Sequence, residues 1–155
     1  MLINFSKYQA LRNDFLVIEA GARRLSAERL GRLAVAACDR RTGVGADGIL
    51  YLGSSRKTDC RADVYNADGS WAEKSGNGLR IVGLHQYLKE RSKRCCSVEM
   101  AGEVSEVRIG RRDGNGYMIA TDLGVPNFQT DQVPVKSRQQ FMIQAPLKLG
   151  GMDFP

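Results

Sequence analysis

Residues 66–80 read NADGSWAEKSGNGLR and constrain the fold more than any other part of the chain. Asn-Ala-Asp-Gly is typical of a tight turn at the end of a strand. The following Ser75, Gly76, Asn77 and Gly78 open an apolar segment that is predicted to be helical, and the first N–H groups of a helix have no partner inside it. Such a helix start attracts carboxylate and phosphate groups. We therefore expect a strand, a turn and an anion-binding helix start in close succession.

Hydrophobic periodicity and turn residues predict an α+β fold. One helix is expected to follow the cap Ser26, and another to cover about residues 77–89. Short strands are expected at residues 2–5, 15–19, 48–52, 61–65, 96–100, 104–109 and 117–121, with a hairpin turn at 113–116. The second helix is apolar over a broad surface, which indicates that a sheet encloses it. The expected architecture is a curved, mostly antiparallel sheet wrapped around a central helix.

Composition narrows the classes of function. The 155-residue chain has a formal net charge of +6, but its basic residues are scattered without interleaved aromatic residues, so we expect no nucleic-acid partner. No apolar run reaches the roughly 18 residues of a membrane helix, and no signal peptide is recognised, so we expect a cytoplasmic protein with no membrane partner. Cys38, Cys60, Cys95 and Cys96 lack zinc-binding spacing and are expected to be buried reduced thiols. His85 is expected to be a hydrogen-bonded core residue.

Residues 43–48, GVGADG, fit the Gly-x-Gly-x-x-Gly pattern of dinucleotide-binding proteins. That pattern requires a preceding strand and a following helix. Here a helix is predicted before the glycines and a strand after them, so the order is reversed. We therefore expect no nicotinamide or flavin cofactor.

Four blocks of the sequence resemble the diaminopimelate epimerase family, whose members are cofactor-independent isomerases. The blocks are Phe5-Ser6-Lys7 with Asn13-Asp14-Phe15, residues 38–48, residues 66–80, and Leu123-Gly124-Val125-Pro126. They stand in order and at compatible spacings over about the first 126 residues. The resemblance implies an amino-terminal domain at 1–126, an interdomain linker at 127–140 and the truncated start of a second domain at 141–155. Family members enclose the active site between two such domains.

The resemblance also implies an activity and a site. The activity is the interconversion of LL- and meso-diaminopimelate, in the synthesis of lysine and cell-wall precursors, without cofactor or metal. Ser75 would stand at the proton-transfer position, and Gly76 and Asn77 would hold the substrate carboxylate through their N–H groups. Asn13 and Asn66 would hydrogen-bond the distal amino and carboxyl groups. The related phenazine-biosynthesis isomerases prefer a histidine at the position of Asn77, which argues against that branch.

Departures from the family pattern leave two roles open for Ser75, proton transfer and helix capping. The family has a cysteine in place of Ser75, and a serine hydroxyl needs another group to drive its proton transfer. Asp47, Asp68 and Glu73 are the candidates nearby in sequence. The same serine would equally serve as a helix N-cap. In many relatives a glutamine at the position of Gly48 also touches substrate, and its absence here weakens that contact.

The family's second half has no counterpart in these 155 residues. We therefore expect an epimerase half that is inactive, or nearly so, by itself. The alternative is a non-catalytic remnant or carboxylate-binding module of the same fold. A homodimer that rebuilds the cleft from two copies is a further hypothesis.

Overall fold

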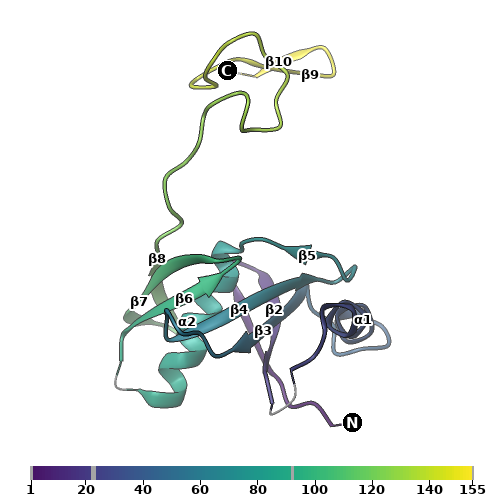
Figure 1. Ribbon diagram of the computed structural model, residues 1–155, viewed down its shortest axis with the longest axis vertical. Helices are drawn as coiled ribbons and strands as arrows, with labels where there is room; N and C mark the ends of the chain where they lie inside the picture. The colour runs from purple at the N-terminus through teal and green to yellow at the C-terminus, as the bar shows by residue number, and fades with distance from the viewer. Residues whose placement is uncertain (1, 22–23, 92, 155) are drawn as a thin grey trace. The chain divides into compact units, whose positions relative to one another are not determined.

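A computed structural model describes residues 2–21, 24–91 and 93–154. These form two compact units, one ending at Leu123 and one beginning at Gly124. The elements of the first unit, drawn in Figure 1, are β1 (Ser6–Ala10), β2 (Asn13–Glu19), α1 (Ala27–Cys38), β3 (Gly48–Gly53), β4 (Cys60–Asn66), β5 (Trp71–Ala72), α2 (Gly76–Glu90), β6 (Cys95–Met100), β7 (Glu103–Asp113) and β8 (Gly116–Thr121).

The strands of the first unit form one sheet in the order β1-β2-β3-β4-β6-β7-β8, with β5 paired to β4. The pairs β2–β3 and β4–β6 are parallel, and the other pairs are antiparallel. α2 contacts β1 and β2 near one edge of the sheet and β6, β7 and β8 near the other. The sheet therefore curls around this helix, which confirms the predicted α+β architecture.

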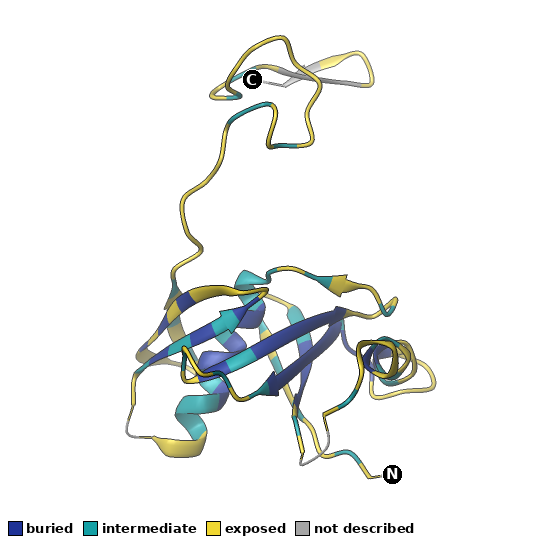
Figure 2. Cartoon of the chain, viewed as in Figure 1, coloured by how far each residue is buried: buried dark blue, intermediate teal, exposed yellow. Residues whose placement is uncertain are grey.

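The central strands are buried on both faces. Phe15, Val17 and Leu50 pack in a core with α2, whereas the alternate residues Leu16 and Ile49 pack in a second core with α1. Figure 2 shows buried residues concentrated along β3, β4 and α2. Because side chains alternate across a strand, a sheet with helices on opposite faces hides both sets.

The predicted positions of the helices and of most strands are confirmed, but the first strand was placed too early. Residues 2–5 form no strand, and β1 begins at Ser6. Its position is set by a two-residue turn at Leu11 and Arg12, with φ of 52° and 69°, which pairs Ala10 with Asn13. Positive φ at both central residues is the type I′ geometry that joins twisted antiparallel strands. The apolar Leu2 is left 91% exposed.

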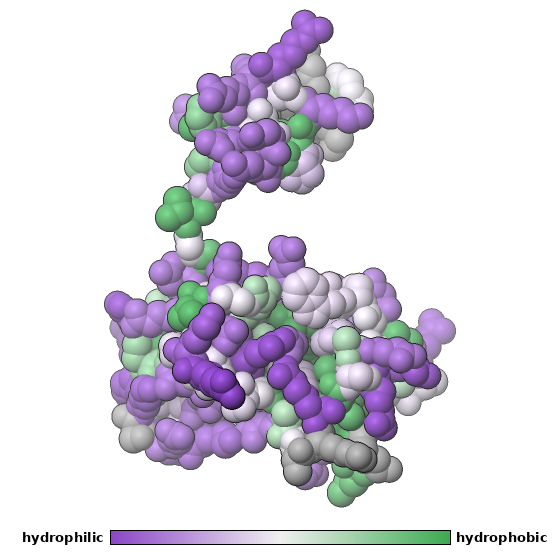
Figure 3. All heavy atoms as spheres, in the orientation of Figure 1, coloured by the Kyte–Doolittle hydropathy of each residue, from purple (hydrophilic) through white to green (hydrophobic). Residues whose placement is uncertain are grey.

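The second unit contains a small hairpin of β9 (Leu147–Leu149) and β10 (Met152–Phe154), with a separate bridge between Gln129 and Phe141. The linker at 127–140 and the domain start at 141–155 remain predictions. Figure 3 shows hydrophilic side chains over most of the visible face of each unit. Among the described residues, no helix is both long and apolar enough to cross a membrane.

Candidate active site

The site residues predicted from the sequence lie at one end of the sheet. The register aligns the start of β3 at Gly48 with the end of β4 at Asn66, and Asn13 opens the neighbouring β2. α2 begins near the same end, because a Cβ at Gly78 would lie 3.0 Å from Cδ2 of Leu50 in β3. The fold thus places the helix start and both asparagines at a common end of the sheet.

The start of α2 has the expected cap. Ser75 has extended backbone, and its Oγ accepts a hydrogen bond of 3.0 Å from the N–H of Gly78. Within the described part of the chain, the N–H groups of Gly76 and Asn77 have no acceptor. Two orphan donors at a helix N-terminus form a ready site for a carboxylate.

The electrostatic surroundings of this helix start favour an anion. The first turn of α2 contains no acidic residue. Two cations flank it: Lys74 pairs with Glu103 at 2.9 Å, and Nη1 of Arg80 donates to Oδ1 of Asn77 at 3.0 Å. The partial positive charge of the helix N-terminus is therefore left without a carboxylate in its own first turn.

None of the three carboxylates nearby in sequence is hydrogen-bonded to Ser75 within the described residues. Asp47 accepts from Asn13 and from other groups. Asp68 accepts from the hydroxyl and the N–H of Ser70, which lower the pKa of Asp68. Glu73 makes no hydrogen bond to Ser75 among the described residues. The geometry therefore supplies a cap at Ser75 but no partner to take its proton.

Asn66 is the last residue of β4, where the following turn begins, and it is exposed. Its N–H donates to the carbonyl of Ser70 at 2.9 Å, and its Nδ2 donates to Oγ of Ser70 at 3.0 Å. Gly69, with φ of 85°, closes the turn by donating to the carbonyl of Asn66. The side chain thus shapes the turn while standing at the end of the sheet that holds the other candidates.

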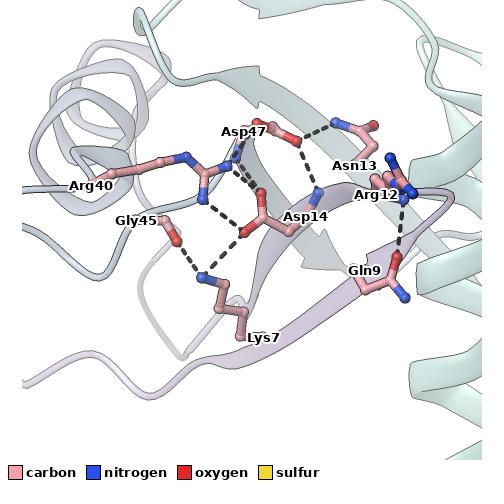
Figure 4. A network of polar contacts seen from close by, with 8 residues as sticks. All are labelled: Lys7, Gln9, Arg12, Asn13, Asp14, Arg40, Gly45 and Asp47. Carbon is pink, nitrogen blue, oxygen red and sulfur yellow. Dashed lines mark hydrogen bonds and ion pairs between the residues drawn. The ribbon is translucent and has the colours of Figure 1, made fainter. Parts of the chain in front are cut away.

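Asn13 belongs to a charged network, shown in Figure 4. Its Nδ2 donates to Oδ2 of Asp47 at 2.9 Å. Arg40 bridges Asp47 and Asp14, at 2.9 and 2.7 Å, and Lys7 pairs with Asp14 at 3.2 Å. The Arg40 guanidinium and the Lys7 ammonium hold the pKa of Asp14 far below its usual range. Lys7, Asp14 and Arg40 were not predicted as site residues; their signal was their place inside the blocks that resemble the family.

Gly48 has no room for a side chain. A Cβ there would lie 2.9 Å from Cε1 of Phe15 and closer still to the carbonyl oxygen of Tyr65. A glutamine at this position would therefore need these neighbours to move. The glutamine contact that the resemblance implies for many relatives therefore stays a prediction, and position 48 has no side chain to make it.

The remaining sequence candidates take structural places. His85 is buried and hydrogen-bonded to Tyr8 and Glu19, as predicted.

The cysteines were predicted to be buried reduced thiols. Cys38, Cys60 and Cys96 are buried free thiols, but Cys95 is only half-buried. Burial raises the pKa of Cys60 to about 12 and that of Cys96 to about 11, so neither is poised as a thiolate. Residues 43–47 lie between the end of α1 and the start of β3, and Gly48 is the first residue of that strand, so the order is reversed as predicted. Among the described residues, no cluster of three or more His, Cys, Asp or Glu could hold a metal ion.

Comparison with known proteins assigns the chain to a family. The family described as diaminopimelate epimerase matches residues 5–129. The diaminopimelate epimerase of Caldanaerobacter subterraneus subsp. tengcongensis is 36% identical over 153 residues, which is 98% of this chain and 54% of the relative. That of Pelotomaculum thermopropionicum is 32% identical over 150 residues, 96% of this chain and 54% of the relative. The chain thus spans about half the length of these relatives.

A solved structure supports the fold. The crystal structure of the Bacillus anthracis phenazine biosynthesis protein, PhzF family, aligns with a TM-score of 0.55 at 18% identity, over 76% of this chain and 38% of that one. The family match covers the helix start at Ser75, the two asparagines and the charged network at Asp47. This chain belongs to the diaminopimelate epimerase family.

Proposed function

We propose that residues 1–126 form one wall of the active site of a cofactor-independent amino-acid epimerase that interconverts LL- and meso-diaminopimelate. The observation that carries the proposal is the start of α2. Its N–H groups at Gly76 and Asn77 have no acceptor in the described chain, and no acidic residue stands in the same turn. A substrate carboxylate bound there would place the neighbouring α-carbon beside Ser75.

Inversion of an α-carbon needs one group that removes a proton and another that returns a proton on the opposite face. As the α-proton leaves, negative charge moves onto the substrate carboxylate, where the two N–H groups stabilise it. Ser75 supplies a hydroxyl on one face only, and that hydroxyl is engaged with Gly78. The 155-residue chain alone is therefore expected to catalyse no measurable inversion.

The test is exchange of the α-proton of LL-diaminopimelate in D₂O, followed by NMR. The unmodified chain is expected to show none, and brisk exchange by it would overturn the prediction of inactivity. Ser75→Cys is expected to raise exchange above the unmodified chain, because a thiol at a helix N-terminus ionises far more readily than a hydroxyl. Ser26→Cys, the same change at the cap of α1, is the matched control and should have no effect.

A second candidate function is a carboxylate-binding module without chemistry. The cap contact of Ser75 favours it, because this hydroxyl has no hydrogen-bonded carboxylate in the described chain. Calorimetric titration with diaminopimelate separates the two. Saturable binding with no exchange by Ser75→Cys indicates a binding module, and a flat titration leaves only a scaffold.

We also propose that residues 127–140 link this domain to a second one that begins at 141–155. The share of the curated relatives covered by the chain, 54%, supports this organisation. The intact mass of the endogenous protein tests it. A mass near twice 17.1 kDa is expected, and a mass of 17.1 kDa would contradict it.

A further inference from the structure

The carboxamide of Asn13 has a donor end and an acceptor end, and the end that faces a ligand decides what it binds. Its Nδ2 lies 2.9 Å from Oδ2 of Asp47. A carboxylate only accepts hydrogen bonds, so the nitrogen has to face Asp47. Figure 4 shows the amide oxygen of Asn13 directed away from Asp47. The hydrogen bond to Asp47 therefore fixes the orientation of the Asn13 amide.

Asp47 is itself held at both carboxylate oxygens. Its Oδ1 accepts from Nη2 of Arg40 at 2.9 Å, and its Oδ2 accepts from the N–H of Asp14 at 3.0 Å as well as from Asn13. Its own N–H donates to Oδ1 of Asp14 at 3.1 Å. Arg40 also pairs with Asp14, which Lys7 contacts in turn. Charge-assisted bonds to both of its oxygens favour one position of the carboxylate.

We propose that Asp47 is a positioning residue that makes Asn13 present its carbonyl oxygen to the ligand, so that this position selects an ammonium group and rejects a carboxylate. This inference rests on the proposed function. It also sharpens the site, because the resemblance left open which of Asn13 and Asn66 takes the distal amino group. The distal carboxylate must then be bound by donors other than Asn13.

The test compares two ligands of the 155-residue chain by ¹⁵N NMR titration. LL-diaminopimelate carries the distal ammonium group, and L-2-aminopimelate is the same molecule without it. The unmodified chain is expected to bind diaminopimelate about tenfold more tightly, the effect of one charge-assisted hydrogen bond. Shifts of the Gly76 and Asn77 amides report the carboxylate end, which both ligands share.

Asp47→Ala is expected to reduce the affinity ratio to about one. The variant removes the acceptor that holds Nδ2 of Asn13, so the carboxamide can rotate and present its nitrogen to the ligand. The double variant Asp47→Ala with Asn13→Asp restores the preference, because a carboxylate at position 13 presents an oxygen whichever way it turns. The matched control is Asp63→Ala, which removes an aspartate bridged by Arg24 and Arg61 and should keep the ratio of the unmodified chain.

The outcomes separate this inference from the proposed function. If both ligands shift Gly76 and Asn77 and bind the unmodified chain with equal affinity, the carboxylate site stands and the positioning role is overturned. If neither ligand shifts them, the proposed function fails and the inference fails with it. An unchanged ratio in Asp47→Ala also overturns the inference. If that variant does not fold, Asn13→Ala takes its place, and a retained preference there has the same meaning.

Discussion

The two helices of the first unit begin with the same cap and differ in what surrounds it. Oγ of Ser26 accepts from the N–H of Arg29 at 3.4 Å, and Oγ of Ser75 accepts from the N–H of Gly78 at 3.0 Å. The first turn of α1 contains Glu28, whereas that of α2 contains no acidic residue. A serine cap therefore satisfies one backbone donor at the amino end of a helix, and the charges beside the cap decide whether that end can bind an anion.

The helices also differ in how far the rest of the fold encloses them. Substitutions that test this difference should have the largest effect on the free energy of unfolding. Leu79 of α2 is fully buried, and Val35 of α1 is 51% exposed. Leu79→Ala is expected to lower the free energy of unfolding by about 3 kcal/mol, because it leaves a cavity in the core. Val35→Ala should cost below about 0.5 kcal/mol. Chemical denaturation measures both, and similar losses would show that α2 is not the enclosed helix.

Removal of either cap should have the next largest effect. Ser75→Ala and Ser26→Ala are each expected to lower the free energy of unfolding by about 1 kcal/mol. The loss should be greater at Ser75, because its cap bond is the shorter one. Thermal and chemical denaturation of the two variants give the comparison. A greater loss at Ser26 would contradict it.

Exchanging the first-turn charges should have a smaller effect on stability but a clear effect on binding. Asn77→Asp places a carboxylate in the first turn of α2 and should raise the free energy of unfolding by about 0.5 kcal/mol, while Glu28→Gln in α1 should lower it by a similar amount. Asn77→Asp should also weaken the acetate-induced shift of the Gly76 amide. A stabilised variant that binds acetate as before would show that the positive end of α2 does not hold the anion.

The carboxylates close to the carboxyl ends of the helices should have the smallest effect on the free energy of unfolding, because these groups are largely exposed. Asp39 follows α1, and its pKa is lowered by the N–H groups of Thr42 and Arg41. Lys93, beyond α2, holds the pKa of Asp59 at about 2. Because these values lie below those of the unfolded chain, both carboxylates stabilise the fold above pH of about 4.

That stabilisation should be lost as the pH falls from about 4 towards 2. Asp59→Asn should make the free energy of unfolding less dependent on pH in this range. Denaturation at several pH values, at low and high salt, measures the slope. A slope as steep in the variant as in the unmodified chain would exclude Asp59 as a contributor.

Local chemistry made much of the fold predictable. Ser26, the glycines at 76 and 78 and the Asp-Gly-Asn-Gly turn each act on their neighbours in the chain, and the structure shows these elements where they were expected. The first strand was misplaced because Leu11 and Arg12 are not residues that signal a turn, although both adopt positive φ. An apolar run at residues 2–5 looked more like a strand than the segment that pairs with β2.

The candidate site was predictable only in part. Ser75, Gly76 and Asn77 were found because their backbone groups form a local motif. The bond between Asn13 and Asp47 spans 34 positions and exists because β2 and β3 pair in parallel. Contacts that depend on strand pairing leave no trace in local periodicity. The packing that excludes a side chain from Gly48 depends on Tyr65 and Phe15 of the neighbouring strands in the same way.

The reversal of strand direction between β3 and β4 has a topological consequence. α1 connects the parallel strands β2 and β3, and α2 lies in the connection between the parallel strands β4 and β6. Right-handed crossovers that advance in the same direction across a sheet, from strands of opposite polarity, put their helices on opposite faces. Because α1 leads into the start of β3 and α2 follows the end of β4, the carboxyl end of α1 and the amino end of α2 lie at one rim. The antiparallel pairing of β3 and β4 thus brings the loop that carries Arg40 and Asp47 to the rim where α2 begins.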